Sequence, residues 1–536
     1  MSHAKLLDCT LRDGGYVVDK YFGETEIRGI IKGLLDANLD VIECGFLDDT
    51  DPFEPGYTAF NYVSQVTPYL PENRGNASYV CLADYSRYDI SKLEPYDGSS
   101  IDGVRACFFK KERYDVIEFC RQIKEKGYKL YVQPVDILGY TDAEIIELIE
   151  SINPLEPYAF SIVDTFGSMF KEDLQRIFHL VHHNLADGIN MGFHSHNNMQ
   201  MSYALSQEFI TMSQGLRKVV VDATVCGMGR GAGNTNTELM MNYMNKKYEG
   251  TYNIDMALDV IDNYIDSIRT EHEWGYSIPY YIAGMYSAHV NNISYLSKKA
   301  GIISKDVRYI LNKIGPVKCK RYEYDLLEET YLEYMNSSID DAAAIENLKK
   351  AISGKEVLLI LPGKSVMAQE QKIADYINQN HPIVIGVNLI RDIFQMDYIY
   401  FSNRSRHDYW ANDKRYPALK KIIASNVKQD SDNMTSIVDF TKLIKCGWNY
   451  LDNSGILLLR LLDQLDVSKI SLAGFDGFDG NDSNYAKKAL EKKESDLDAK
   501  QANADILSML SDYKSSRSTN CPINFITPSR FSKVFE

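Results

Sequence analysis

The sequence contains no apolar run that approaches the roughly 20 residues needed to cross a bilayer. Its first residues lack the apolar segment of a secretion signal. Its nine cysteines are scattered without any Cys-x-x-Cys spacing, which is typical of reduced thiols and argues against a disulfide framework. Basic residues are outnumbered, 58 against 74 acidic ones, for a net charge of −16. These absences argue against a membrane or a nucleic acid as partner and predict a cytoplasmic protein.

With 536 residues, the chain is long enough for two or three domains. In about its first 250 residues, short β-rich runs alternate with amphipathic helical stretches such as 24–37 and 171–184. The candidate strands are Lys5–Asp8, Val41–Gly45, Ala77–Leu82, Gly103–Phe108, Lys129–Pro134, Ala159–Asp164, Asn190–His194 and Lys218–Asp222. An open doubly wound sheet rarely needs so many parallel strands. The pattern therefore favours a closed (β/α)8 barrel, the TIM barrel, over residues 1–250.

The strand pattern is lost over residues 251–352, which read as helical, and we expect this segment to be a helical extension that completes the active site. Buried strands then return and again alternate with helical stretches. Their predicted starts are Val357, Pro382, Tyr398 and Lys469. The predicted fold class is therefore α/β: a TIM barrel, a helical segment, and a Rossmann-like α/β domain over residues 353–536.

Two histidines in the run His194-Ser195-His196 follow the seventh candidate strand. Residues two apart on a strand point the same way, so both imidazoles are expected to leave one face together. Most isolated His-x-His pairs have no function, so the spacing alone is only half of a metal site. The position of the pair at a strand end is what gives it weight.

Polar residues gather after several other candidate strands. Arg12 and Asp13 follow the first, Glu43 ends the second and Thr165 follows the sixth, while a glycine-rich run, 227–234, follows the eighth. In a TIM barrel the active site forms where the strands end at their carboxyl side. We therefore expect these side chains to meet in one site.

Three of these motifs together resemble the metal-dependent superfamily of TIM-barrel aldolases and Claisen-type lyases and synthases. They are Thr10-Leu-Arg-Asp-Gly14, His194-x-His196 and Gly227-x-Gly-x-Gly-x-Gly-Asn234. Within that superfamily, Ala283-Gly-Met-Tyr-Ser287 resembles the helical segment that follows the barrel in 4-hydroxy-2-oxovalerate aldolases. The resemblance covers about residues 1–300.

The resemblance implies that Asp13, His194 and His196 are ligands of a divalent metal. Two imidazoles and one carboxylate leave coordination positions for water and a 2-oxo acid. The nitrogen ligands favour Mn²⁺ over Mg²⁺, with Co²⁺ and Zn²⁺ as further options. Arg12 is expected to face the oxygen that becomes negative during the reaction, or else to close the barrel mouth as a salt bridge.

Three further residues are expected around the substrate. By resemblance, Thr165 offers its hydroxyl to the substrate carboxylate, although a helix N-cap would use a threonine there equally well. Asn234 matches an asparagine near the metal, but asparagine after glycine is also ordinary loop chemistry. Glu43 either reaches the metal through water or pairs with Arg12, and buried pairing is the favoured reading.

The proton-transfer residues are the least determined part of the predicted site. Tyr286 matches the tyrosine of the aldolase segment, where a phenol can donate or accept a proton. At the position where the aldolases carry a histidine as general base, this chain has Tyr16. A tyrosine with a pKa near 10 is a poor base at neutral pH. A depressed pKa, another group such as His289, or a different substrate would account for Tyr16, and a different substrate is favoured.

The C-terminal domain loosely resembles nucleotide-sugar-binding domains of bacterial sialyltransferase-like proteins. The turn at Gly363 and Ser365 lies between a strand and a helix, where backbone amides can receive a phosphate. Asn388 and Asn403 lie just beyond strands, where they could contact a ribose or base, or simply serve as turn residues. No Gly-x-Gly-x-x-Gly fingerprint of a nicotinamide domain follows a strand here.

Three functions are consistent with these residues. The first is a metal-dependent aldolase that joins or separates a pyruvate enolate and an aldehyde, which could be linked to a sugar. The second is a Claisen-type transferase that joins an acyl-CoA to a 2-oxo acid. The third assigns the main function to the C-terminal domain as a nucleotide-sugar binder or transferase. The expected partners are small molecules, and we expect a homo-oligomer.

Overall fold

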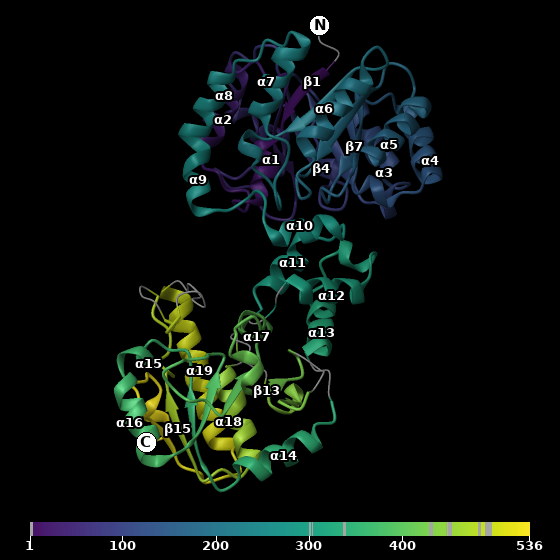
Figure 1. The fold of residues 1–536 in the computed structure, drawn as a ribbon. Helices are drawn as coiled ribbons and strands as arrows, with labels where there is room; N and C mark the ends of the chain where they lie inside the picture. Colours follow the sequence, from purple (N-terminus) through teal and green to yellow (C-terminus); the bar gives the residue numbers. More distant parts are fainter. Residues whose placement is uncertain are drawn as a thin grey trace. The chain divides into compact units, whose positions relative to one another are not determined.

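The computed structural model describes residues 4–299, 302, 304–335, 339–427, 432–445, 448, 453–480, 484–487 and 496–536. The chain forms two compact units (Figure 1). The first comprises Met1–Ile293 with Gly315–Tyr322, and the second comprises Ser294–Ile314 with Glu323–Glu536. The two units therefore share the segment predicted as a helical extension. Within the described ranges, no helix has the length and apolar character needed to span a membrane.

A closed barrel of eight parallel strands forms the centre of the first unit. The strands are β1 (Ala4–Asp8), β2 (Val41–Leu47), β4 (Ser78–Asp84), β5 (Gly103–Phe108), β6 (Lys129–Pro134), β7 (Ala159–Asp164), β8 (Asn190–Ser195) and β9 (Val219–Ala223). Pairing of β1 with both β9 and β2 closes the sheet, and the short β3 (Ala59–Phe60) extends the edge of β2. The predicted TIM barrel is confirmed.

Helices surround the barrel with their apolar faces turned inward. In α5, for example, the buried residues Leu174, Ile177, Phe178 and Val181 recur at the three- and four-residue spacing of one helix face. The helices of this unit are α1 (Thr10–Asp13), α2 (Glu24–Asp36), α3 (Val116–Glu125), α4 (Asp142–Ile152), α5 (Lys171–Asn184), α6 (Ser202–Ser213), α7 (Thr237–Tyr248), α8 (Ile254–Val260), α9 (Asp266–Glu271), α10 (Ile278–Met285) and α11 (Val290–Ser297), which crosses into the second unit. After β2 and β4, short 3-10 turns stand where the barrel pattern would place helices.

The barrel interior changes from apolar to polar along the strands. One interior layer is apolar and consists of Leu7, Val41, Val80, Tyr131, Ala159 and Val220. Side chains two residues further along a strand point the same way. The next interior positions are therefore the buried polar residues Glu43, Gln133, Ser161 and Asp222. This order places the polar layer toward the carboxyl ends of the strands.

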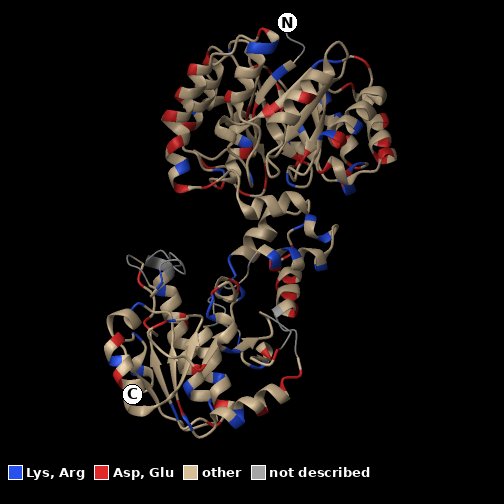
Figure 2. Cartoon of the chain, in the orientation of Figure 1, with Lys and Arg blue, Asp and Glu red and all other residues tan. Residues whose placement is uncertain are grey.

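Acidic side chains dominate part of the outer surface of the barrel unit. Five acidic residues and one basic residue, Arg269, lie along α8, α9 and the π-helical turn Ile261–Ile265 between them (Figure 2). The acidic residues are Asp255, Asp259, Asp262, Asp266 and Glu271. Such a surface repels phosphate backbones and agrees with the net charge of −16.

The second unit contains a parallel sheet of seven strands in the order β14-β13-β12-β11-β10-β15-β16. Their bounds are β10 (Glu356–Ile360), β11 (Ile383–Val387), β12 (Tyr398–Phe401), β13 (Lys420–Ala424), β14 (Thr435–Val438), β15 (Lys469–Ala473) and β16 (Ile523–Phe525). The strand order reverses at β10, which has β11 on one side and β15 on the other. This is the arrangement of a doubly wound sheet, so the predicted Rossmann-like class is confirmed.

Helices cover this second sheet, with α16 and α18 on opposite sides in Figure 1. The helices of the second unit are α12 (Ser304–Ile314), α13 (Tyr324–Met335), α14 (Ala342–Ile352), α15 (Ser365–Ala368), α16 (Glu370–Asn380), α17 (Arg404–Ala411), α18 (Ser454–Gln464) and α19 (Asp496–Ser516). The strands predicted near Val357, Pro382, Tyr398 and Lys469 correspond to β10, β11, β12 and β15. The sequence pattern did not reveal β13, β14 or β16.

A glycine allows α2 to approach α8 closely. A Cβ added to Gly33 would lie 2.2 Å from Cγ2 of the buried Val260. Alanine forms helices better than glycine by about 1 kcal/mol, yet we expect Gly33→Ala to lower the free energy of unfolding by about 1–3 kcal/mol through overpacking. Chemical denaturation measures the change, and adding Val260→Ala should recover part of it. A Gly33→Ala protein as stable as the wild type would contradict this packing.

Candidate metal centre

Asp13, His194 and His196 meet at the carboxyl end of the barrel. Asp13 ends the short helix α1 directly after β1, His194 lies on β8, and His196 follows that strand. Their ligand atoms lie within 4.8 Å of one another, and all three residues are buried. Asp13 Oδ2 is 3.3 Å from His194 Nε2 and 3.7 Å from His196 Nε2. One carboxylate and two imidazoles thus converge on a space that could hold a divalent metal.

Asp222 sets the orientation of His194. Its Oδ2 lies 3.0 Å from His194 Nδ1, so the other ring nitrogen, Nε2, is directed at Asp13. Burial opposes ionisation of Asp222, but Arg105 and His194 outweigh it and hold its pKa below the usual value. A carboxylate that fixes the outer nitrogen of a histidine is a common support of metal ligands.

Charged residues on or directly after five strands close a ring inside the barrel. Arg12 Nη1 donates to Asp13 at 2.7 Å, and Arg12 Nε donates to Glu43 at 2.8 Å. Arg105 on β5 pairs with Glu43 at 2.9 Å and also with Asp222. His194 joins Asp222 back to Asp13. The predicted pairing of Glu43 with Arg12 is present, and Arg105 is its second partner.

The charge of this ring fits a bound cation. The carboxylates of Asp13, Glu43 and Asp222 outnumber the guanidinium groups of Arg12 and Arg105 by one in a buried place. Burial lowers the pKa of His194, but its hydrogen bonds to Asp13 and Asp222 outweigh burial and raise it, so either a proton on His194 or a bound cation balances the ring. The Asp13 pKa lies well below its usual value, because Arg12 and the two histidines outweigh the effect of burial. Burial lowers the pKa of His196 to about 4. At neutral pH both groups are in the protonation states that bind metals.

Asn234 adds an unsatisfied amide beside the histidines. It forms an isolated antiparallel bridge with His196. Its side-chain oxygen and nitrogen are both buried, and neither has a hydrogen-bond partner in the part of the chain that the structure describes. A Cβ added to Gly229 would lie 2.2 Å from this amide nitrogen and 3.1 Å from Asp13 Oδ1. Glycine therefore lets the loop close over Asp13, and the free amide is available to a ligand.

Tyr16 and His289 both contact Arg230 of the same glycine-rich loop. The Arg230 guanidinium lies over the Tyr16 ring, 5.3 Å from its centroid, and contacts His289 Nε2. Tyr16 is 41% exposed, yet its pKa is raised, with desolvation as the largest cause. Burial and Arg230 lower the pKa of His289 to about 3. Neither group is therefore suited to act as a general base at neutral pH.

Thr165 and Tyr286 lie on neighbouring parts of the barrel mouth. Thr165 Oγ1 accepts a hydrogen bond from the Asp136 amide at 2.7 Å, whereas the N-cap of α5 is Phe170. Tyr286 is half-buried at the end of α10. The next residue, Ser287, donates to Ser168 after β7 at 3.1 Å. Figure 1 shows α10 across the barrel end that lies away from the N-terminus. β1 runs toward this same end.

The sequence pattern did not point to three residues that contribute to this site: Arg105, Asp222 and Arg230. A charged residue amid apolar neighbours was the available signal for Arg105 and Asp222, because strand interiors rarely hold unpaired charge. Arg230 carried no such signal, because it lies in a loop.

The closed barrel, with one carboxylate and two imidazoles gathered at the carboxyl ends of its strands, has the features of a TIM-barrel protein with a candidate divalent-metal centre. Residues 106–263 match the HMGL-like family model. The chain is similar to oxaloacetate decarboxylase of Mycobacterium tuberculosis, with 24% identity over 307 residues, 55% of this chain and 87% of the relative.

Two of the aldolase relatives extend this similarity. For 4-hydroxy-2-oxovalerate aldolase of Pseudoalteromonas translucida, identity is 26% over 345 residues, 61% of this chain and 94% of the relative. For the Marinomonas sp. enzyme of the same name, identity is 29% over 327 residues, which cover 58% of this chain and 92% of the relative. These matches agree with the predicted resemblance of the barrel to the metal-dependent aldolase superfamily. The predicted likeness of the C-terminal unit to sialyltransferase-like domains stays a prediction.

If Asp222 orients His194, its charge supports metal binding as well as the buried ring. We expect Asp222→Asn to weaken Mn²⁺ binding by about 10- to 100-fold, because the histidine loses its anionic support. Titration calorimetry with Mn²⁺ measures the affinity, and Asp187→Asn on the surface is the matched control. Unchanged affinity in Asp222→Asn would contradict the assignment.

Proposed function

We propose that the barrel is a divalent-metal-dependent aldolase that makes or breaks the bond between a pyruvate enolate and an aldehyde. Asp13, His194 and His196 are the proposed metal ligands, and Mn²⁺ is the proposed ion. The observation that carries this proposal is the convergence of the three ligand atoms within 4.8 Å of one another, in a buried ring where carboxylates outnumber guanidinium groups. The HMGL-like family match and the aldolase relatives support the same reaction class.

A divalent cation held there would supply Lewis-acid chemistry, since it polarises the 2-oxo group and stabilises the enolate charge. The chain itself adds Arg12. Its Nε and Nη1 are used by Glu43 and Asp13, and Nη2 takes part in neither contact. We assign Nη2 to the substrate oxygen that becomes negative, where a fixed guanidinium in a buried site stabilises charge most effectively.

Asn234 and Thr165 are the proposed contacts of the substrate carboxylate. The Asn234 amide is buried and unsatisfied, so a carboxylate oxygen that accepts from it would remove that cost. Thr165 uses its oxygen to accept from Asp136, which leaves its hydroxyl proton to donate. Tyr286 is the proposed proton donor to the enolate carbon, since its segment is held at the barrel mouth through Ser287.

Tyr16 argues for a substrate other than 4-hydroxy-2-oxovalerate. Cleavage of that aldol requires a base on the substrate hydroxyl, and a tyrosine with a raised pKa does not supply one. A different aldehyde, including one linked to a sugar, is the first explanation.

Decarboxylation of a 2-oxo dicarboxylate is a second candidate. Loss of CO₂ leaves the electron pair of the broken bond in the same pyruvate enolate, and a proton then adds to that carbon. No hydroxyl has to be deprotonated, so the protonated Tyr16 favours this reaction, and the oxaloacetate decarboxylase relative supports it. The Claisen-type alternative is not favoured, because the aldolase and decarboxylase names of the relatives point away from it.

Exchange of the pyruvate methyl protons tests the enolate step shared by both candidates. In D₂O with Mn²⁺ and no CoA, we expect deuterium to enter the methyl group and chelation to stop it. Arg12→Lys keeps the buried charge but misplaces its donors, so exchange should slow by about 100-fold or more. Arg176→Lys on the surface of α5 is the matched control. Absence of exchange with every divalent metal would contradict the proposal.

Replacement of Tyr16 by histidine should restore the missing base. We expect Tyr16→His to raise kcat/KM for cleavage of 4-hydroxy-2-oxovalerate by about 100-fold, the usual contribution of a positioned base. Tyr16→Phe should leave pyruvate exchange unchanged, because Tyr16 is not assigned that proton. Release of CO₂ from oxaloacetate, assayed alongside, separates the two candidates. Loss of exchange in Tyr16→Phe would show that Tyr16 is itself the base.

A further inference from the structure

A cavity of about 220 Å³ lies at the carboxyl ends of the strands in the second unit. Two turns border it: Leu361–Gly363 after β10 and Gly474–Gly477 after β15. They pass so closely that a Cβ on Gly363 would lie 2.4 Å from the Gly474 carbonyl oxygen. The strand order reverses between these two strands, and doubly wound sheets bind their ligands at such a point.

Amide and hydroxyl side chains line one side of the cavity. Asn388 is only 8% exposed and holds the left-handed backbone conformation, with φ of 54°. Its Nδ2 donates to Ser454 at 2.9 Å, but its Oδ1 has no partner among the described residues. Asn426 likewise donates to the Ser402 carbonyl at 3.1 Å and keeps an unpartnered, buried Oδ1. Two buried acceptors at one cavity call for a ligand that brings hydroxyl or amino donors.

The same side of the cavity is electropositive. The N-cap residues of α17 and α18, Asn403 and Asn453, both line it, so the positive ends of two helix dipoles meet there. Arg406 lies beside them, and across the described ranges no carboxylate pairs with it. An anion at this place would receive a guanidinium and two helix ends.

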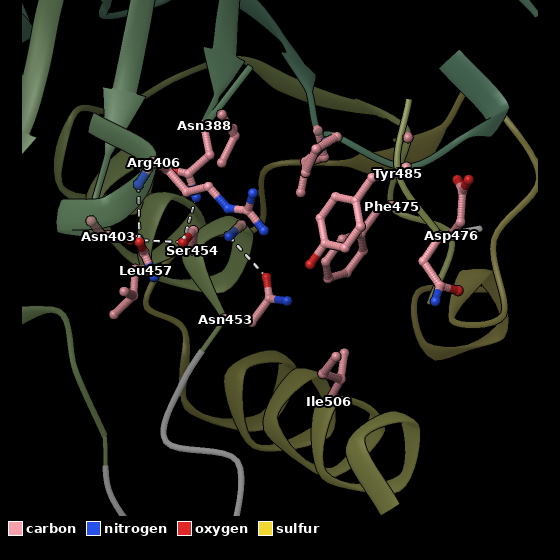
Figure 3. A pocket seen from close by; sticks show the side chains of 18 of the residues that line it. Asn388, Asn403, Arg406, Asn453, Ser454, Leu457, Phe475, Asp476, Tyr485 and Ile506 are labelled. Atoms are coloured by element: carbon pink, nitrogen blue, oxygen red, sulfur yellow. Dashed lines mark hydrogen bonds between the residues drawn. The ribbon is translucent and has the colours of Figure 1, made fainter. Parts of the chain in front are cut away.

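Aromatic rings form another wall. The Arg406 guanidinium lies 5.1 Å from the centroid of the Tyr485 ring. Figure 3 shows Tyr485 and Phe475 beside Arg406, with Asp476 on the far side of the rings. The carboxylate of Asp476 is already engaged, since it accepts from the Ser365 amide at 2.7 Å and from the Ser365 hydroxyl. The flat faces of these rings suit a planar ligand group.

Of the four residues predicted for nucleotide binding, Gly363, Asn388 and Asn403 line this cavity. Ser365 is not among the lining residues, and its amide and hydroxyl donate to Asp476. The turn that we expected to receive a phosphate therefore holds a carboxylate of the protein itself. The anion-binding end lies instead at α17 and α18.

We propose that this cavity binds a nucleoside phosphate, either free or as part of a nucleotide sugar. The phosphate lies at Arg406 and the starts of α17 and α18. Ribose hydroxyls donate to the free oxygens of Asn388 and Asn426, and the base packs on Tyr485 and Phe475. This site belongs to a different unit from the aldolase centre and does not depend on the function proposed for the barrel.

Calorimetric titration of the full chain tests this binding. The probes are the four ribonucleoside 5′-monophosphates, the corresponding nucleosides and inorganic phosphate. At least one monophosphate should bind about tenfold or more tightly than its nucleoside, since the nucleoside lacks the charge-assisted contacts to Arg406. It should also bind more tightly than inorganic phosphate, which lacks the base and ribose. Binding of none of the nucleotides, or of inorganic phosphate equally well, would overturn the proposal.

Two variants separate binding from folding. In Ser454→Asp the carboxylate can still accept from Asn388 and Ser402 and suits a helix start, yet its charge repels a phosphate. Arg406→Gln removes the cation. Each should weaken nucleotide binding by about tenfold or more at an unchanged thermal midpoint, while Lys414→Gln, on the surface outside the cavity, binds as the wild type does. Wild-type affinity in both cavity variants would overturn the proposal. If one variant has a lowered thermal midpoint, the nucleotide affinity of the other variant decides.

Discussion

The closed ring of buried charges at the carboxyl end of the barrel is the interaction on which the candidate site depends. It runs from Asp13 through Arg12, Glu43, Arg105 and Asp222 to His194 and returns to Asp13. Removing one member would leave a neighbour charged and unpaired in the interior, which costs about 3–5 kcal/mol. Hydrophobic packing alone could fold a barrel. The ring accounts for the charged residues Glu43, Arg105 and Asp222 in the barrel interior.

The ring also fixes the geometry of the chemistry. Each of its side chains comes from a strand or from the first residues after one, so the sheet holds them in place. Glycine-rich backbone after β9 then brings Asn234 and Arg230 to the same place, because Gly229 leaves no side chain between the loop and Asp13.

The sequence predicted the barrel well because buried parallel strands read as short apolar runs, and these runs are unambiguous in residues 1–250. His194, His196 and Asp13 were predictable from their positions at strand ends and from the motif resemblance. A charge amid apolar neighbours marked Arg105 and Asp222 as buried and paired, but their partners lie on other strands, so their role in the site was not predictable. Similarly, the sequence around Ser365 did not show that its amide and hydroxyl donate to the distant Asp476. β14 and β16 are the outermost strands and have four and three residues, and β13 begins with two lysines, so the apolar signal is weak in all three.

The central claim is that Asp13, His194 and His196 hold a divalent metal, and metal content tests it most directly. Purified protein loaded with Mn²⁺ and desalted should retain one Mn²⁺ per chain by elemental analysis, a stoichiometry expected of a single three-ligand centre. His194→Ala and His196→Ala should lose it while circular dichroism shows the barrel intact. Full Mn²⁺ content in either variant would contradict the account.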